Sequence, residues 1–164
     1  MKKLFETESS WLLLVQRVVL GGVMFAHGAQ KLLGWFGGYG YEGTMGYFTG
    51  MVGLPYALGL LVIVAEFFGS LGLITGTLTR VGAFGIAAVM IGAVATSHMN
   101  VGFFMNWGGN LKGEGFEYHL LALAIAFPLM IKGGGLYSVD SFIARALNRG
   151  SVSRPEARPG YTAA

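Results

Sequence analysis

The distribution of hydrophobic and polar positions along the chain predicts membrane-spanning helices. Four segments are predominantly apolar and reach or approach the ~20 residues that a helix needs to cross ~30 Å of hydrocarbon. They cover residues 11–33, 54–74, 80–99 and 116–131, and the last is the shortest. The pattern therefore predicts an all-α membrane protein with a four-transmembrane-helix bundle within residues 11–133.

The first apolar segment carries three polar side chains on one face. Arg17, His27 and Lys31 are separated, through Leu20 and Met24, by alternating steps of three and four residues. That spacing places all five on one helical stripe. An ionised side chain at the bilayer centre costs at least ~2.5 to 3.5 kcal/mol on insertion scales. We therefore expect this stripe to face other protein.

Basic residues gather at one end of the predicted bundle. The terminal segments and the short turn near residue 80 hold most of them, whereas the two long loops hold only Lys112, with Lys31 at their edge. By the positive-inside rule, both termini are cytoplasmic and residues 1–10 are a cytoplasmic lead-in. The basic residues on the terminal side are Lys2, Lys3, Arg80, Lys132, Arg145, Arg149, Arg154 and Arg158.

The C-terminal part predicts a short amphipathic helix over residues 136–149. Ser138 can cap it, and its two arginines lie opposite its apolar side chains, as in helices at the inner membrane surface. Residues 150–164 are polar and contain proline, which predicts a disordered tail. The apolar side chains are Leu136, Val139, Phe142, Ile143 and Leu147.

Composition supports a membrane protein and excludes several classes of chemistry. The 164 residues are 54% hydrophobic and 12% charged, against about 25% charged in soluble domains, and the mean hydropathy is +0.60. Without cysteine, the chain has no disulfide, thiolate metal site or cysteine nucleophile of its own. The net charge of +3 does not indicate nucleic acid, because the basic residues lie mostly at the chain ends.

Arg17 and Glu66 form the first candidate pair, because both fall within the middle part of their helices. The structural interpretation is an ion pair that fastens the first helical hairpin. The functional interpretation is a site for a proton or a quinone head group, since ionisable residues inside a membrane are functional candidates by default.

A second polar layer is predicted at the outer ends of the helices. It contains His27, Lys31, His98, Glu117 and His119, with Lys31 and Glu117 as an ion pair. The three histidines with a carboxylate could bind Zn²⁺ or Cu²⁺, but no two of them have metal-ligand spacing on one helix, so no metal is assigned. The other interpretation is hydrogen bonding to loop carbonyls.

Several blocks of this sequence resemble the DoxX family of four-helix bacterial membrane proteins. They are RVVLGGVMFAHGAQKLLG, Glu66 followed by GLITGTLTRVGAF, FFMNW with Glu117 after it, and GGGLYSVDSF, in family order over roughly residues 10–147. The family includes the small membrane subunit type of thiosulfate:quinone oxidoreductase, partners of superoxide dismutase and sulfurtransferase in thiol-stress complexes, and proteins encoded beside catechol dioxygenases. The resemblance implies a multi-pass protein of the bacterial cytoplasmic membrane.

The resemblance also implies quinone- or thiol-linked redox chemistry with a protein partner, either a soluble redox enzyme or another membrane subunit. The family's polar positions correspond here to Arg17, His27, Lys31, Glu66, Asn106 and Glu117. On the quinone hypothesis, Lys31 or His27 donates to a head-group carbonyl, Glu117 handles a proton, and Trp35 and Trp107 cover the ring. No covalently bound cofactor is expected.

Two other hypotheses remain open from the sequence. A non-catalytic anchor or assembly subunit would use its polar layers only to hold the bundle and its C-terminal helix to dock a soluble partner. A small transporter would need several copies, and no pair of unwound helices with inverted symmetry is visible. Stripes of small residues would suit packing within one chain or in a homo-oligomer.

Overall fold

The structure, a computed structural model, describes residues 2–152, and within this range it is all-helical, without a β-strand. The helical elements follow one another along the described chain. They are α1 (Lys2–Phe5), α2 (Trp11–Leu33), the 3-10 turn η1 (Trp35–Gly37), α3 (Gly40–Gly46), the π-helical segment η2 (Tyr47–Met51), α4 (Tyr56–Thr75), α5 (Thr79–Ala93), the π-helical segment η3 (Val94–His98), α6 (Glu117–Lys132) and α7 (Val139–Val152).

Among residues 2–152, three helices are long and apolar enough to cross a membrane. They are α2, α4, and α5 together with η3, which form one continuous segment over Thr79–His98. This confirms the prediction of an all-α protein with helices of membrane length. The fourth predicted segment forms α6, whose 16 residues extend about 24 Å, less than the ~30 Å of a typical hydrocarbon core.

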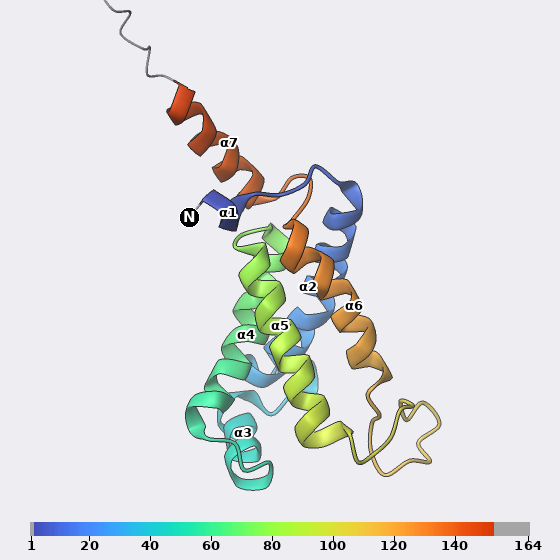
Figure 1. Cartoon of the computed structure of the whole chain (residues 1–164). Helices are drawn as coiled ribbons and strands as arrows, with labels where there is room; N and C mark the ends of the chain where they lie inside the picture. Colours follow the sequence, from blue (N-terminus) through green and yellow to red (C-terminus); the bar gives the residue numbers. More distant parts are fainter. Residues whose placement is uncertain (1, 153–164) are drawn as a thin grey trace, which may run out of the picture.

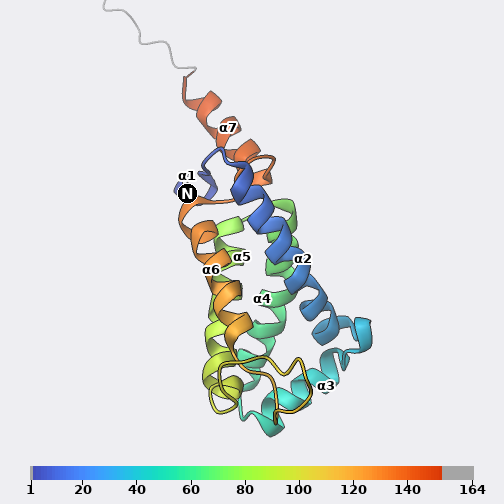
Figure 2. The same ribbon diagram turned by 90° about the vertical axis from the view of Figure 1, so that its right-hand side faces the viewer.

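The four long helices pack around one core. α2 lies against α4 and α6, and α5 lies against the same two helices, so each helix has two neighbours (Figures 1 and 2). The core is built from branched and flexible apolar side chains of all four helices. Its most deeply buried members include Met24, Leu73, Ile86, Ala126 and Leu129.

The segments between the helices separate into two ends of the molecule. The turn between α4 and α5, α1 and the start of α7 lie at one end, called here the terminal end, and α3 and the loop of residues 99–116 lie at the other, the loop end (Figures 1 and 2). The sequence predicts this division. The connector of residues 34–53, expected as a long loop, contains the helix α3. This helix buries Met45 against Gly59. A Cβ atom at Gly59 would lie only 3.2 Å from the methionine Sδ and Cε.

A glycine sets the closest approach of α2 to α4. A Cβ atom on Gly28 would lie 2.7 Å from both the backbone N and the Cα of Phe67. Only hydrogen fits at this crossing, so the two backbones come closer than any other residue would allow. Gly28 is one turn from Lys31, and Phe67 follows Glu66, so the crossing determines how near these two polar side chains lie.

Arg17 fastens the terminal end and does not form the predicted ion pair with Glu66. It is 2% exposed. Its Nε donates to the Gly134 carbonyl at 2.8 Å, and its Nη1 donates to the carbonyls of Leu73 and Ile74 at 3.0 and 2.5 Å. Because the last carbonyls of a helix lack intrahelical partners and carry negative partial charge, the guanidinium binds the end of α4 instead of a carboxylate.

The same end is closed by a carboxylate cap. Asp140, 1% exposed, accepts hydrogen bonds from the backbone N–H groups of Leu78 and Thr79 at 2.8 Å each, at the start of α5. Arg17 Nη2 donates to the carbonyls of Leu136 and Tyr137 at 3.3 and 3.1 Å. The turn before α7 is therefore joined to both α4 and α5.

α7 begins later than expected because the turn before it is needed for these contacts. Its first residue is Val139, and Ser138 caps it as predicted, with its Oγ accepting from the Ser141 backbone N–H at 3.2 Å. The helix points away from the bundle in both views (Figures 1 and 2). It includes residues 150–152, and the rest of the predicted disordered tail lies outside the described residues.

Candidate functional site

The centre of the candidate site is an ion pair between α2 and α4. Lys31 Nζ lies 2.6 Å from Glu66 Oε2, with the two side chains 25% and 4% exposed. The sequence-based prediction paired Lys31 with Glu117, which is wrong: the Gly28 crossing brings Lys31 to α4, one helix away from the element that carries Glu117. Glu66 therefore has a lysine partner in place of the expected Arg17.

His27 lies beside this pair, on the outer surface of the bundle. It interacts electrostatically with both Lys31 and Glu66, and its ring centroid is 6.0 Å from that of Tyr118 on α6. The residue itself is exposed, although Met24 and Gly28 on either side of it are buried. His27 is therefore accessible from outside the bundle and Lys31 partly so, whereas Glu66 is buried.

The polar arrangement continues from α6 to the end of η3. The rings of Tyr118 and His119 are 5.7 Å apart, and the rings of His119 and His98 are 4.3 Å apart. His119 is 6% exposed, and it interacts electrostatically with His27 as well as His98. Tyr118 also interacts with Glu66. All three histidines therefore belong to one cluster, as their predicted depth suggested.

The described residues do not place the three histidines as a metal centre would require. Within residues 2–152, no group of three or more histidine, cysteine, aspartate or glutamate side chains could hold a metal ion. His98 instead has its Nδ1 2.8 Å from the Glu114 carbonyl oxygen. The zinc or copper site considered for His27, His98 and His119 is thus not formed, whereas the hydrogen bond to a loop carbonyl is.

Glu117 organises the loop of residues 99–116 and takes no part in the ion pair. Its Oε1 accepts from the Met105 backbone N–H at 2.9 Å and from Trp107 Nε1 at 3.4 Å. Asn106 exchanges hydrogen bonds with the backbone of Leu111, at 3.0 Å and 2.9 Å. These two residues of the predicted quinone pocket therefore have structural contacts within one loop.

The predicted aromatic cover is spread over two separate connections. Trp107 is 86% exposed and Trp35 is 53% exposed, and Trp35 has its described ring contact with its neighbour Phe36, at 6.3 Å. Of the six residues predicted for the pocket, the structure brings His27 and Lys31 together. It adds Glu66 and Tyr118, of which Tyr118 was missed because an aromatic residue between two polar ones carries no pattern of its own.

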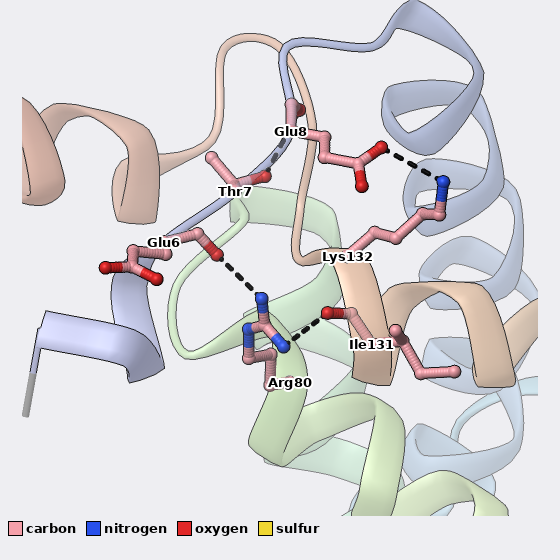
Figure 3. Close-up of a pocket in the computed structure, with 6 residues that line it drawn as sticks. All are labelled: Glu6, Thr7, Glu8, Arg80, Ile131 and Lys132. Carbon is pink, nitrogen blue, oxygen red and sulfur yellow. Dashed lines mark hydrogen bonds and ion pairs between the residues drawn. The ribbon is translucent and has the colours of Figure 1, made fainter.

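A pocket at the terminal end has contacts that hold helices together. It is lined by Glu6, Thr7, Glu8, Arg80, Ile131 and Lys132 (Figure 3). Arg80 donates to the carbonyls of Met130 and Glu6 at 2.9 and 3.0 Å, and Lys132 pairs with Glu8 at 3.1 Å. Arg80 thus binds the end of α6 as Arg17 binds the end of α4.

Comparison with known proteins decides the family. Residues 12–99, which include α2, α4 and α5 with the Lys31–Glu66 pair, match the family model described as DoxX. The chain belongs to the DoxX family. A relative of this DoxX protein is the "Putative oxidoreductase CatD" of Bacillus subtilis (strain 168), which is 30% identical over 140 residues, 85% of this chain and 92% of the relative. No solved structure matches the chain.

Proposed function

We propose that this DoxX protein is a membrane subunit of a quinone-linked oxidoreductase system, and that a quinone head group binds beside His27 from the bilayer. The observation that carries the proposal is the position of His27, which is exposed on α2 and interacts electrostatically with the half-buried Lys31 and the buried Glu66. Quinones are lipid-soluble, so a polar group that opens toward lipid at this level suits them. The name of the Bacillus subtilis relative also favours redox chemistry.

The residues of the site fit a quinone in hydrogen bonding and charge. A quinone supplies the exchange of two electrons and two protons. The His27 imidazole can donate a hydrogen bond to a head-group carbonyl, and the Lys31 ammonium contributes positive charge close behind it. Glu66 balances that charge across the 2.6 Å ion pair. In this proposal electrons come from a partner or a soluble donor, because the chain has no cysteine with which to form a dithiol–disulfide couple of its own.

The proposal includes a membrane arrangement. α6 is the fourth membrane-spanning segment. Apolar residues that flank it and local thinning of the bilayer compensate for its short length. The terminal end, with Arg80 and Lys132, faces the cytoplasm by the positive-inside rule, and the loop end faces outward. The protein is then a multi-pass component of the bacterial cytoplasmic membrane.

In a thiol-linked version of the proposal, the same quinone site receives its electrons from a different donor. Because the chain has no thiol, a partner enzyme would oxidise the thiol or sulfur compound and pass electrons to quinone at His27. Both versions require quinone binding, and they differ only in the protein that supplies the electrons.

A second candidate function, an anchor for a soluble partner, is favoured by α7. The helix projects beyond the terminal end (Figure 2). Its apolar side chains Val139, Phe142 and Leu147 are 39%, 58% and 42% exposed. A double substitution, Phe142→Ser with Leu147→Ser, preserves the capping by Asp140. Loss of a co-purifying protein without loss of quinone affinity would assign docking to α7 and quinone binding to the bundle.

The test of the quinone proposal is equilibrium binding of a short-chain quinone to the purified protein in nanodiscs. Quenching of tryptophan fluorescence measures the binding. The wild type is expected to bind saturably, and His27→Leu is expected to lower affinity about tenfold, which corresponds to one lost hydrogen bond with a charged or strongly polar site. Gln16→Leu is the control, because Gln16 lies on the same helix but outside the polar layer that contains His27. No saturable binding, or equal binding by His27→Leu, would contradict the proposal.

A further inference from the structure

His98 stands at the end of the cluster nearest the loop of residues 99–116. A carbonyl oxygen only accepts hydrogen bonds, so the 2.8 Å contact with the Glu114 carbonyl requires that His98 Nδ1 carry a hydrogen. In the neutral ring, the lone pair is therefore on Nε2. His98 is partly buried, so Nε2 is an acceptor on the border between the loop and the bundle.

His119 is next, and one of its ring nitrogens lacks a well-formed hydrogen bond. Its Nδ1 is buried and has no partner at ordinary hydrogen-bond geometry, in a residue that is only 6% exposed, although the Phe116 backbone interacts with the ring. Leaving a buried polar atom unpaired is unfavourable, and such atoms are rare enough in proteins that each needs an explanation. The ring lies 4.3 Å from that of His98, within reach of a direct or single-water contact.

Tyr118 connects His119 to the ion pair. Its ring is 5.7 Å from that of His119 and 6.0 Å from that of His27. Its hydroxyl donates to Met24 Sδ at 3.6 Å, and a thioether is a weak acceptor. The hydroxyl therefore gives up little when it turns toward a better partner, as a proton-passing group must.

We propose that these four residues, the histidine–tyrosine file (His98, His119, Tyr118 and His27), carry protons between the loop end and the Lys31–Glu66 pair. His98 Nε2 accepts a proton from water and, because Nδ1–H stays bound to the Glu114 carbonyl, the same nitrogen then releases that proton to His119. Each later member of the file takes up one proton and releases one, and one proton is delivered to the Glu66 carboxylate. That step converts Glu66 to the neutral acid and releases Lys31 from the pair. No electron moves in it, and the reverse sequence returns the proton to water.

The other charged groups near the file are already engaged. Glu114 Oε2 accepts from the Asn106 backbone N–H at 2.7 Å, and Glu117 is bound to Met105 and Trp107. The only ion pair in electrostatic contact with the file in the described chain is Lys31 with Glu66. Protons that move along the file therefore reach the Lys31–Glu66 pair. This inference rests on the proposed function, because a quinone bound beside His27 exchanges protons as well as electrons.

The experiment measures hydrogen exchange between the histidine rings and water by ¹⁵N NMR of histidine-labelled protein in nanodiscs. The chain contains three histidines, so single substitutions assign every signal. Tyr118→Phe keeps the ring and removes the hydroxyl, and His119→Phe interrupts the file at a second point. Each is expected to slow exchange at His27 by about tenfold or more, the lower range of what a positioned proton-transfer group contributes.

Met24→Leu is the matched control, because it removes the thioether that holds the Tyr118 hydroxyl but leaves every member of the file. Exchange at His27 should remain as in the wild type, or become faster. Unchanged exchange in both file variants, or equal slowing in Met24→Leu, would overturn the inference. Tyr118→Phe is nearly isosteric, so it gives an answer even if His119→Phe does not fold.

Quinone affinity, measured on the same samples, separates this inference from the proposed function. If the wild type binds no quinone but Tyr118→Phe slows exchange at His27, the file stands and the proposed function fails. If quinone binds and exchange is unchanged, the quinone site stands and the file fails.

Discussion

Lys31 Nζ and Glu66 Oε2 are 2.6 Å apart, and this contact joins α2 to α4 next to the point where Gly28 lets the two backbones meet. The pair is asymmetric: the glutamate side chain is 4% exposed and the lysine side chain 25%. A long lysine stem can carry its ammonium toward a polar surface, whereas the carboxylate has no such route. Consequences for stability and for function both follow from this asymmetry.

We expect Lys31→Met to destabilise the protein more than Glu66→Gln. The first leaves a buried carboxylate without its partner, which costs roughly 3 kcal/mol or more. The second leaves an ammonium group that can reorient and an amide that can still accept a hydrogen bond from it. Equilibrium unfolding in mixed micelles measures both.

The pair of Lys132 with Glu8 is the matched control, because its side chains are 51% and 57% exposed at an N–O distance of 3.1 Å. Exposed pairs contribute about 0 to 1 kcal/mol, so Glu8→Gln should change the free energy of unfolding by less than about 1 kcal/mol. A cost for Lys31→Met no larger than for Glu8→Gln would contradict the buried pair.

Gly28→Ala is expected to separate α2 from α4. The added methyl would lie 2.7 Å from backbone atoms of Phe67, which cannot move as a side chain can. Overpacking of this kind costs about 1 to 3 kcal/mol, and it should also weaken quinone binding by moving Lys31 away from Glu66.

Gly22 on the same helix gives the comparison, since nothing lies within 4 Å of the position of its Cβ. Gly22→Ala should be neutral or stabilise the helix by up to about 1 kcal/mol. Similar effects of the two substitutions would show that the α2–α4 crossing is looser than described.

Arg17→Lys should destabilise the terminal end despite keeping the charge. The guanidinium donates to five carbonyls at once, and a lysine ammonium lacks that planar fork. We expect a loss of about 3 kcal/mol, since hydrogen bonds from charged groups contribute about 1.5 to 3 kcal/mol each, and faster proteolysis at residues 133–138. Arg145→Lys, at an exposed arginine near the Phe142 ring, should change stability by less than about 1 kcal/mol.

Asp140→Ala should loosen the start of α5 together with the base of α7. It removes the acceptor for two backbone N–H groups, and the loss of such a cap costs about 1 to 2 kcal/mol. Asp140→Asn keeps one acceptor oxygen and should lose less. Hydrogen exchange at the amides of Leu78 and Thr79 reports the effect directly, and protection that survives in the alanine variant would be incompatible with the cap.

Glu117→Gln tests the part of the candidate site that the structure reassigns. Because Glu117 binds Met105 and Trp107 within one loop, the substitution should shift Trp107 fluorescence and make the loop more sensitive to protease. Quinone affinity should stay within about twofold of the wild type, less than the effect of one lost hydrogen bond. A large loss of affinity would return Glu117 to the binding site, as the sequence predicted.

The sequence predicted the long helices because they depend on periodicity, and Arg17, Leu20 and Met24 of the α2 stripe are buried as expected. His27 departs from the prediction that the whole stripe faces protein, because it is exposed. The sequence assigned the partners of Arg17 and Lys31 wrongly, since depth along a helix says nothing about rotation toward a neighbour. The carbonyls that bind Arg17 belong to the end of α4 and to a glycine turn, and backbone acceptors leave no mark in the sequence. Tyr118 was missed for a similar reason: only packing against α2 distinguishes it from the aromatic residues at the ends of the helices.

The most direct measurement is photo-crosslinking with an azido-quinone in native membranes, followed by peptide mapping. The proposed site predicts label on α2 around His27 and on α4 around Glu66, and much less label in His27→Leu. Label confined to the loop of residues 99–116, or no labelled peptide that excess unmodified quinone can compete away, would contradict it.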